Sequence, residues 1–242
     1  MARTCLGADR ANQLDVNGRS HILAKILGAV RRTERGTVSL LSSQFSHFRR
    51  RRMCEFLREF KISKDTKVLD LGGTAQLWTY AEVLPDLTIV NLGIPENPPL
   101  QDKVRWVEAD ATRLPFPDDS FDVVFCNSLI EHLGSYEKQK LLAGEIKRMS
   151  KRYFVQTPNR RFPFDMHMLV PCFHWLPKFL QRRLARLTVW GLITKPSREA
   201  AAAYVDELRL MTCKELHSLF PSGAIVRERF MWMTKSLYAL SR

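Results

Sequence analysis

The chain has 242 residues, which is enough for one domain with an extension. Its formal net charge of +13 favours anionic partners, such as phosphates, nucleic acid or an acidic membrane face, without choosing among them. Its five cysteines are scattered, with no Cys-x-x-Cys pair or Cys/His cluster, so the sequence predicts no disulfide framework and no metal site. We therefore expect a reduced, cytoplasmic setting. No apolar run approaches the roughly 18 residues that span a bilayer.

Residues 1–44 form a basic, polar N-terminal extension. Apolar residues at helical spacing predict a short amphipathic helix within residues 22–30, which we expect to pack on the domain. The alternative is a membrane-surface segment or a substrate lid. Residues 46–60 predict a further helix, in which the four consecutive arginines at 49–52 would form a solvated face.

Residues 67–71 carry the apolar run of a short strand covered on both faces, with Asp70 near its end. Gly72 and Gly73 follow, and without a Cβ atom they let the backbone turn sharply and let a ligand come close. Because ligands of open α/β sheets sit outside the carboxyl ends of the strands, this turn is a candidate cofactor site.

The rest of the chain alternates strands and helices, which predicts an α/β fold: a Rossmann-like, doubly wound, mainly parallel sheet with helices on both faces. We expect strands at 87–92, 104–110, 122–127 and 152–156, and helices at 76–84, 136–149 and 212–220. Leu141, Leu142 and Ile146 would lie on the inner face of the helix at 136–149. Residues 224–230 and 236–240 predict a closing C-terminal antiparallel hairpin.

Residues 157–196 interrupt this alternation. The segment is rich in aromatic residues and arginines, and Asp165 is its one acidic residue. An insertion at the carboxyl end of a central strand is well placed to form the roof of a substrate pocket.

Two segments carry a recognisable motif. Residues 114–125 read Leu-Pro-Phe-Pro-Asp-Asp-Ser-Phe-Asp-Val-Val-Phe, and residues 127–133 read Asn-Ser-Leu-Ile-Glu-His-Leu. Together with the strand and glycine turn upstream, they resemble the class I methyltransferases that depend on S-adenosyl-L-methionine (SAM), in particular the type-11 group. The resemblance covers residues 45–242 and implies a methyltransferase domain of that extent.

The resemblance implies that SAM lies against the carboxyl ends of the first four strands. The residues at the matching positions are Asp70, Gly72, Gly73, Asn91, Asp110, Ala111 and Asn127. Asp70 and Gly72 would meet the methionine end of SAM, Asn91 the ribose, and Asp110 with Ala111 the adenine. The alternative for each Asp or Asn is a turn or capping role. The family's Gly-x-Gly-x-Gly pattern departs here, with Thr74 and Gln76 in place of the later glycines.

The resemblance places Glu131 and His132 near the reacting methyl group or the acceptor. A neutral His132 would accept the proton of an acceptor hydroxyl; the alternative is that it only packs or caps. His167 is a second candidate base, which Asp165 would orient. Asn159 lies in what resembles the family's substrate-side turn.

The leading hypothesis is a SAM-dependent methyltransferase that transfers a methyl group to a small-molecule or lipid-linked acceptor, with oxygen as the favoured acceptor atom. An RNA methyltransferase is the runner-up, because the chain is basic and has arginines near aromatic residues. The other alternative is a non-catalytic binding protein with the methyltransferase fold. The charge also agrees with a peripheral contact on an anionic membrane, and the oligomeric state stays open.

Overall fold

The computed structural model describes residues 37–94, 98, 100 and 103–242. The predicted helix at 22–30, and all of the predicted extension before residue 37, lie outside these residues. Within the described part of the chain, no helix combines the length and the apolar character needed to cross a membrane.

A sheet of seven strands forms the centre of the molecule, in the order β3-β2-β1-β4-β5-β9-β8. The strands are β1 (Lys67–Leu71), β2 (Asp86–Asn91), β3 (Val104–Glu108), β4 (Val123–Asn127), β5 (Tyr153–Pro158), β8 (Ala224–Phe230) and β9 (Met233–Ser241). The first five pair in parallel, and β9 pairs antiparallel with both β5 and β8. The predicted parallel sheet with a closing hairpin is confirmed.

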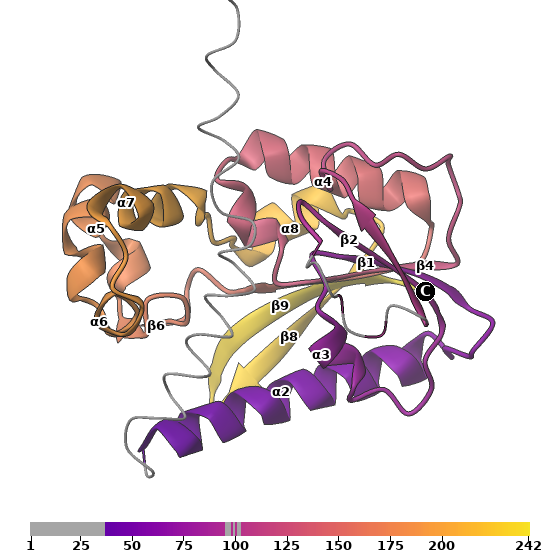
Figure 1. The fold of residues 1–242 in the computed structure, drawn as a ribbon, viewed down its shortest axis with the longest axis horizontal. Coiled ribbons are helices and arrows are strands. Elements are labelled where there is room, and N and C mark those ends of the chain that lie inside the picture. Colours follow the sequence, from indigo (N-terminus) through magenta and orange to yellow (C-terminus); the bar gives the residue numbers. More distant parts are fainter. Residues whose placement is uncertain (1–36, 95–97, 99, 101–102) are drawn as a thin grey trace, which may run out of the picture.

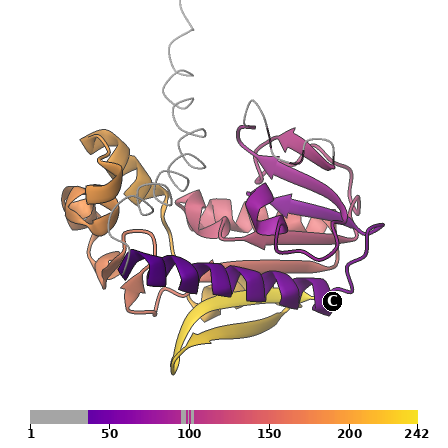
Figure 2. The same ribbon diagram turned by 60° about the horizontal axis from the view of Figure 1, so that its bottom comes forward.

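Helices cover both faces of the sheet, as predicted (Figure 1). On one face lie α4 (Tyr136–Met149) and α8 (Cys213–Leu219), and on the other α2 (Thr37–Glu59) and the short α3 (Ala75–Trp78). Successive strand residues serve the two faces in turn: Leu69 packs toward α4, whereas Val68 packs toward α2. Figure 2 shows α2 running along the sheet beside the β8–β9 hairpin.

Capping residues determine where two of the predicted helices begin. The Ser135 hydroxyl accepts a hydrogen bond from the backbone N–H of Lys138 and caps the start of α4. At α8, Thr212 and Glu215 form a reciprocal capping box, which satisfies the free N–H groups of the first turn.

Three expectations for helices were wrong. The crossover helix predicted at 76–84 ends at Trp78, and the residues before β2 form turns. Leu141 is 56% exposed rather than on the inner face, because Leu142, Ile146 and Met149 already form the buried stripe of α4. Arg52 is 7% exposed, so the arginine run is not a uniformly solvated face.

The insertion forms a lobe beside the sheet, at the left of Figure 1. It contains β6 (Phe164–Asp165), β7 (Val170–Pro171), η2 (Phe173–Trp175), α5 (Lys178–Leu184), η3 (Ala185–Leu187), α6 (Val189–Thr194) and α7 (Arg198–Glu207). The lobe has its own core, in which Phe173 and Trp190 pack against Val205 of α7. Because α7 completes this core, the lobe reaches beyond the predicted boundary at residue 196.

Candidate functional site

The glycine turn after β1 is tied to the end of β2. Gly72 adopts a φ of +71°, which glycine tolerates and other residues rarely adopt, and its N–H donates to the carbonyl of Val90 at 2.9 Å. The side-chain amide of Asn91 donates to the carbonyl of Gly73 at 3.0 Å. The structure therefore brings Gly72, Gly73 and Asn91 together at one edge of the sheet, where the sequence predicted the cofactor.

Asp70 supports this turn from within the protein, since it is only 1% exposed. Its Oδ2 accepts a hydrogen bond of 2.7 Å from the indole N–H of Trp78, whereas its Oδ1 has no hydrogen-bond partner among the residues that the structure describes. Burial raises the pKa of Asp70 to about 7, against the opposing effect of the Trp78 hydrogen bond. A Cβ atom on Gly73 would lie 1.9 Å from Asp70 Oδ2, so Gly73 has to be glycine for the buried carboxyl to fit.

Asp110 and Ala111 lie just past the end of β3. Asp110 is exposed, and its Oδ1 accepts hydrogen bonds from both the backbone N–H and the hydroxyl of Thr112, each at 2.8 Å. The turn role weighed for this residue is therefore present. Its contact with adenine stays a prediction, which the exposed position at the carboxyl edge supports.

A buried polar network that the sequence did not reveal lies behind Asn127. Arg52 of α2 donates to both carboxylate oxygens of Glu228, at 3.1 and 2.8 Å, and also to Gln156 and, at 3.3 Å, to Asn127 Oδ1. Burial alone would raise the pKa of Glu228. The hydrogen bonds from Arg52 have the larger, opposite effect, so the pKa of Glu228 is lowered. Arg52 thereby holds Asn127 at the carboxyl end of β4.

Glu131, His132 and His167 converge beyond the end of β4. Ligand-type atoms of the three side chains all lie within 4.8 Å of one another. Glu131 and His132 belong to the short helix η1 (Ile130–Leu133), whereas His167 comes from the lobe, just after β6. The sequence predicted each of these residues near the reacting methyl group or the acceptor, and the structure places them together.

Glu131 is fully buried, and its two carboxylate oxygens differ. Oε2 accepts a hydrogen bond of 3.0 Å from the hydroxyl of Thr157. Within the described residues, Oε1 has no hydrogen-bond partner, and it lies 4.0 Å from His167 Nε2. Burial raises the pKa of Glu131, and the charge interaction with His167 opposes that rise. The ring centroids of His132 and His167 are 5.0 Å apart.

Asp165 lies behind His167, as predicted. Its Oδ1 is 3.7 Å from His167 Nδ1 and its Oδ2 is 3.5 Å from His174 Nδ1. Burial alone would raise the pKa of Asp165, but its interactions with these two imidazoles have the larger, opposite effect and hold its pKa well below the usual range. Asp165, His167 and His174 line a cavity of about 190 Å³ together with basic residues of the lobe, including Lys178.

The side chain of Asn159 hydrogen-bonds to the backbone of two neighbouring segments. Its side-chain N–H donates to the carbonyl of Thr234 at 2.8 Å, and its Oδ1 accepts from the backbone N–H of Arg161 at 3.2 Å. Asn159 therefore fastens the start of the insertion to β9. Its predicted contact with a substrate stays a prediction.

Comparisons with known proteins agree with this arrangement. Residues 87–153 match the family model described as a methyltransferase domain. A search of curated proteins found no match.

Two solved structures share the fold at low sequence identity. The first is magnesium protoporphyrin IX methyltransferase from Synechocystis PCC 6803 with bound SAH, with a TM-score of 0.53 at 10% identity, over 93% of this chain and 98% of that chain. The second is a putative methyltransferase from an antibiotic biosynthesis pathway of Anabaena variabilis, with a TM-score of 0.50 at 16% identity, over 74% of this chain and 64% of that chain.

The family match runs from β2 to the start of β5 and includes the turn at Asp110 and the Glu131-His132 pair. The fold supplies the strand order and the closing hairpin around that segment. Residues 87–153 therefore match the methyltransferase-domain family, and the chain as a whole has the fold of SAM-dependent methyltransferases of known structure.

Proposed function

We propose that the protein transfers a methyl group from SAM to a hydroxyl oxygen of a small-molecule or lipid-linked acceptor. The observation that carries this proposal is the cluster of Glu131, His132 and His167, which lies just beyond the end of β4, where the lobe meets the sheet. The cluster supplies two imidazoles and a carboxylate beside the edge where the family binds its cofactor.

We call the carboxyl ends of β1 to β4 the cofactor edge. SAM would lie there, between the Gly72-Gly73 turn and the turn after β3. Bound SAM would supply a methyl group on a positively charged sulfur, which the acceptor oxygen displaces in line. Gly72 and Gly73 offer a backbone that can approach the methionine end without a Cβ in the way. Asp110 is exposed at the far end of the edge, where a carboxylate oxygen would accept from the adenine amino group.

The proton of the acceptor hydroxyl would go to an imidazole of the cluster. His132 and His167 are the two candidate bases, as the sequence predicted. His167 has carboxylates on both sides, Asp165 near Nδ1 and Glu131 near Nε2, and both would stabilise the imidazolium that forms. The proton that the acceptor hydroxyl loses on methylation would stay on this imidazole.

The surface of the lobe supports an anionic or membrane-borne acceptor. A concavity of about 620 Å³ between α5, α6 and α7 is lined by five cationic side chains: Arg182, Arg183, Arg186, Lys195 and Arg198. Leu187 and Leu192 at its rim are 70% and 62% exposed. Cations around exposed apolar side chains are the pattern of proteins that contact anionic lipid surfaces. We call this surface the cationic concavity.

Calorimetric titration with SAM and with its demethylated product tests the cofactor part of the proposal. Both should bind the wild type in the micromolar range, and Asp110→Ala should abolish binding while leaving the circular dichroism spectrum unchanged. His132→Ala should retain SAM binding but slow transfer to hydroxylated acceptors. If the folded wild type binds neither ligand, the non-catalytic alternative takes the place of this proposal.

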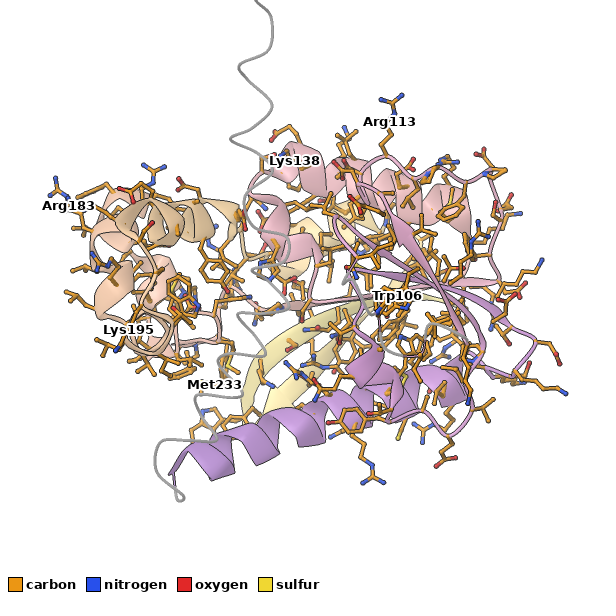
Figure 3. All side chains as sticks on the ribbon, in the orientation of Figure 1. Trp106, Arg113, Lys138, Arg183, Lys195 and Met233 are labelled. Carbon is orange, nitrogen blue, oxygen red and sulfur yellow. The ribbon has the colours of Figure 1, made fainter. Side chains whose placement is uncertain are left out.

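Sedimentation with vesicles tests the membrane part. Vesicles with phosphatidylglycerol should bind the protein, neutral phosphatidylcholine vesicles should not, and salt should weaken binding. The double substitution Arg183→Glu with Arg186→Glu should remove most of the binding. Arg113→Glu with Lys138→Glu is the matched control, because it changes the net charge by the same amount and both residues are exposed away from Arg183 and Lys195 (Figure 3). Equal loss in the control would mean that net charge alone attracts the vesicles.

RNA methylation is the second candidate, and the cationic concavity is the observation that favours it, since phosphate backbones attract the same cations. A gel-shift series with RNA of mixed sequence distinguishes the two. A salt-sensitive RNA shift that disappears in the Arg183→Glu, Arg186→Glu variant, with no vesicle binding by the wild type, would favour RNA.

A further inference from the structure

The Glu131 carboxylate is set up as one half of an ion-binding site. Its Oε1 is buried and has no hydrogen-bond partner in the part of the chain that the structure describes, although buried carboxylate oxygens are costly to leave unsatisfied. Oε2 is held by the Thr157 hydroxyl at 3.0 Å, which fixes the direction in which Oε1 points. Oε1 therefore faces His167 Nε2 across 4.0 Å, a distance too long for a hydrogen bond.

A cation fits the spacing of the three side chains. Two atoms that each lie about 2.1 Å from one ion can be at most about 4.2 Å apart. The 4.0 Å between Glu131 Oε1 and His167 Nε2 already meets this limit. All pairs among Glu131, His132 and His167 lie within 4.8 Å, so small side-chain rotations would bring the third ligand within reach.

The side chains that contact two of the proposed ligands, His167 and Glu131, are of the kind that contact metal ligands in other proteins. A metal-bound histidine usually has its second ring nitrogen beside a carboxylate or carbonyl, which sets its tautomer and orientation. His167 has Asp165 in that place, 3.7 Å from Nδ1. Thr157 plays the corresponding part for Glu131.

We propose that Glu131, His132 and His167 bind a divalent transition-metal cation. Two imidazoles and one carboxylate favour borderline cations such as Zn²⁺, Mn²⁺ or Fe²⁺ over Mg²⁺, which prefers all-oxygen sites. Three protein ligands leave a coordination position open on the ion, which an oxygen of the acceptor would occupy. This role in acceptor binding rests on the proposed methyl transfer, whereas the site itself does not. With the ion bound, His132 and His167 would be ligands in place of bases, and the ion would stabilise the acceptor oxygen after its proton has passed to solvent.

Zinc binding to the untagged, metal-depleted protein tests the site directly. Titration calorimetry with Zn²⁺ alone should give one site per chain, and Co²⁺ should give visible absorption bands of a nitrogen- and oxygen-ligated ion. Glu131→Gln and His167→Asn should each weaken binding by roughly 100-fold or more, and Asp165→Asn by roughly 10- to 100-fold. His217→Asn is the matched control, because His217 is exposed on α8, and it should leave binding unchanged.

The outcomes separate this inference from the proposed function. No stoichiometric binding by the wild type, or binding that survives both Glu131→Gln and His167→Asn, overturns the metal site and leaves the imidazoles as bases. Since His132 is on the partly exposed side of the cluster, His132→Asn provides a ligand variant that should fold even if a buried substitution does not. Loss of SAM binding with intact zinc binding would instead contradict the proposed function alone.

Discussion

Arg52 provides the sharpest test of how this fold is held together. We expect Arg52→Met, which keeps most of the apolar stem, to leave Glu228 buried and without its main partner. Removing one member of a buried ion pair costs about 3–5 kcal/mol. Lys235 Nζ remains 3.9 Å from Glu228, and the Tyr238 hydroxyl still donates to Glu228, so the lower end, about 3 kcal/mol, is expected. For a chain of this length that loss corresponds to a Tm lower by roughly 6–12 °C.

The pH dependence of the free energy of unfolding shows whether the unpaired Glu228 carboxylate causes the loss of stability. In the wild type the folded-state pKa of Glu228 is lowered, so Glu228 contributes stability above its unfolded pKa and loses it as pH falls. In Arg52→Met the effect of burial is no longer outweighed, so the folded-state pKa is raised and the variant loses stability as pH rises. The difference between the two proteins should therefore be largest near pH 7 and shrink toward pH 4.

Urea unfolding at several pH values measures this difference, and Arg51→Met is the matched control. Arg51 is the neighbouring arginine, but its side chain is 60% exposed and it pairs with Glu55 within the same helix. Its loss should cost less than about 0.5 kcal/mol at every pH. The reasoning fails if Arg52→Met costs under about 1 kcal/mol, or if its cost does not change between pH 4 and pH 7.

Two further predictions concern the cofactor edge. Because the folded-state pKa of Asp70 is raised to about 7, the wild type should lose up to about 4 kcal/mol as pH rises from 4 to 8, at about 1.4 kcal/mol per pH unit. Asp70→Asn, which can still accept from Trp78, should match the wild type at pH 4 and be more stable at pH 8; equal unfolding curves at pH 8 would contradict this. Gly72→Ala should cost at least about 1–2 kcal/mol, since its φ is +71° and the new Cβ would lie 2.9 Å from Leu129 Cδ1. Gly144→Ala, in the exposed middle of α4 with open space around it, should instead gain about 0.5–1 kcal/mol.

The sheet could be predicted because its signals are local. Each central strand is a short apolar run between turn residues, and the strand predicted before the Gly72-Gly73 turn is present as β1. Caps fixed the start of α4, where Ser135 precedes an amphipathic segment. The helix predicted at 76–84 failed because Trp78 turns inward to Asp70, an attraction that depends on the sheet and not on helical periodicity.

The buried network could not be predicted from the sequence for the opposite reason. Arg52 stands in a run of four arginines, and nothing in that run distinguishes the one that is buried. Its partner Glu228 is 176 residues away, between two arginines of β8, where an alternating charged strand suggests solvent exposure. Only the packing of α2 across the sheet next to the closing hairpin makes the two meet.

The cluster of Glu131, His132 and His167 could be predicted from the sequence only in part. The resemblance placed Glu131 and His132 near the acceptor, and His167 was a second candidate base from the insertion, but the convergence of the three depends on how the lobe meets the sheet. Two backbone hydrogen bonds set that meeting: Arg209 N donates to the carbonyl of Glu131 at 2.7 Å, and Gly134 N donates to the carbonyl of Glu207 at 2.9 Å.

The lobe also reaches the cluster through its own core. Trp190 stacks on Tyr204 at a centroid distance of 4.6 Å, and the Tyr204 ring lies 6.3 Å from that of His132. His167 is carried by the lobe, whereas Glu131 is carried by the segment after β4, so the 4.0 Å between them is a distance between two separately packed units. The packing of the lobe therefore sets the position of His167 relative to Glu131, while the glycine turn is positioned by β1 and β2. Under the proposed function, sequence changes within the lobe would alter which acceptor is methylated and leave the cofactor edge intact.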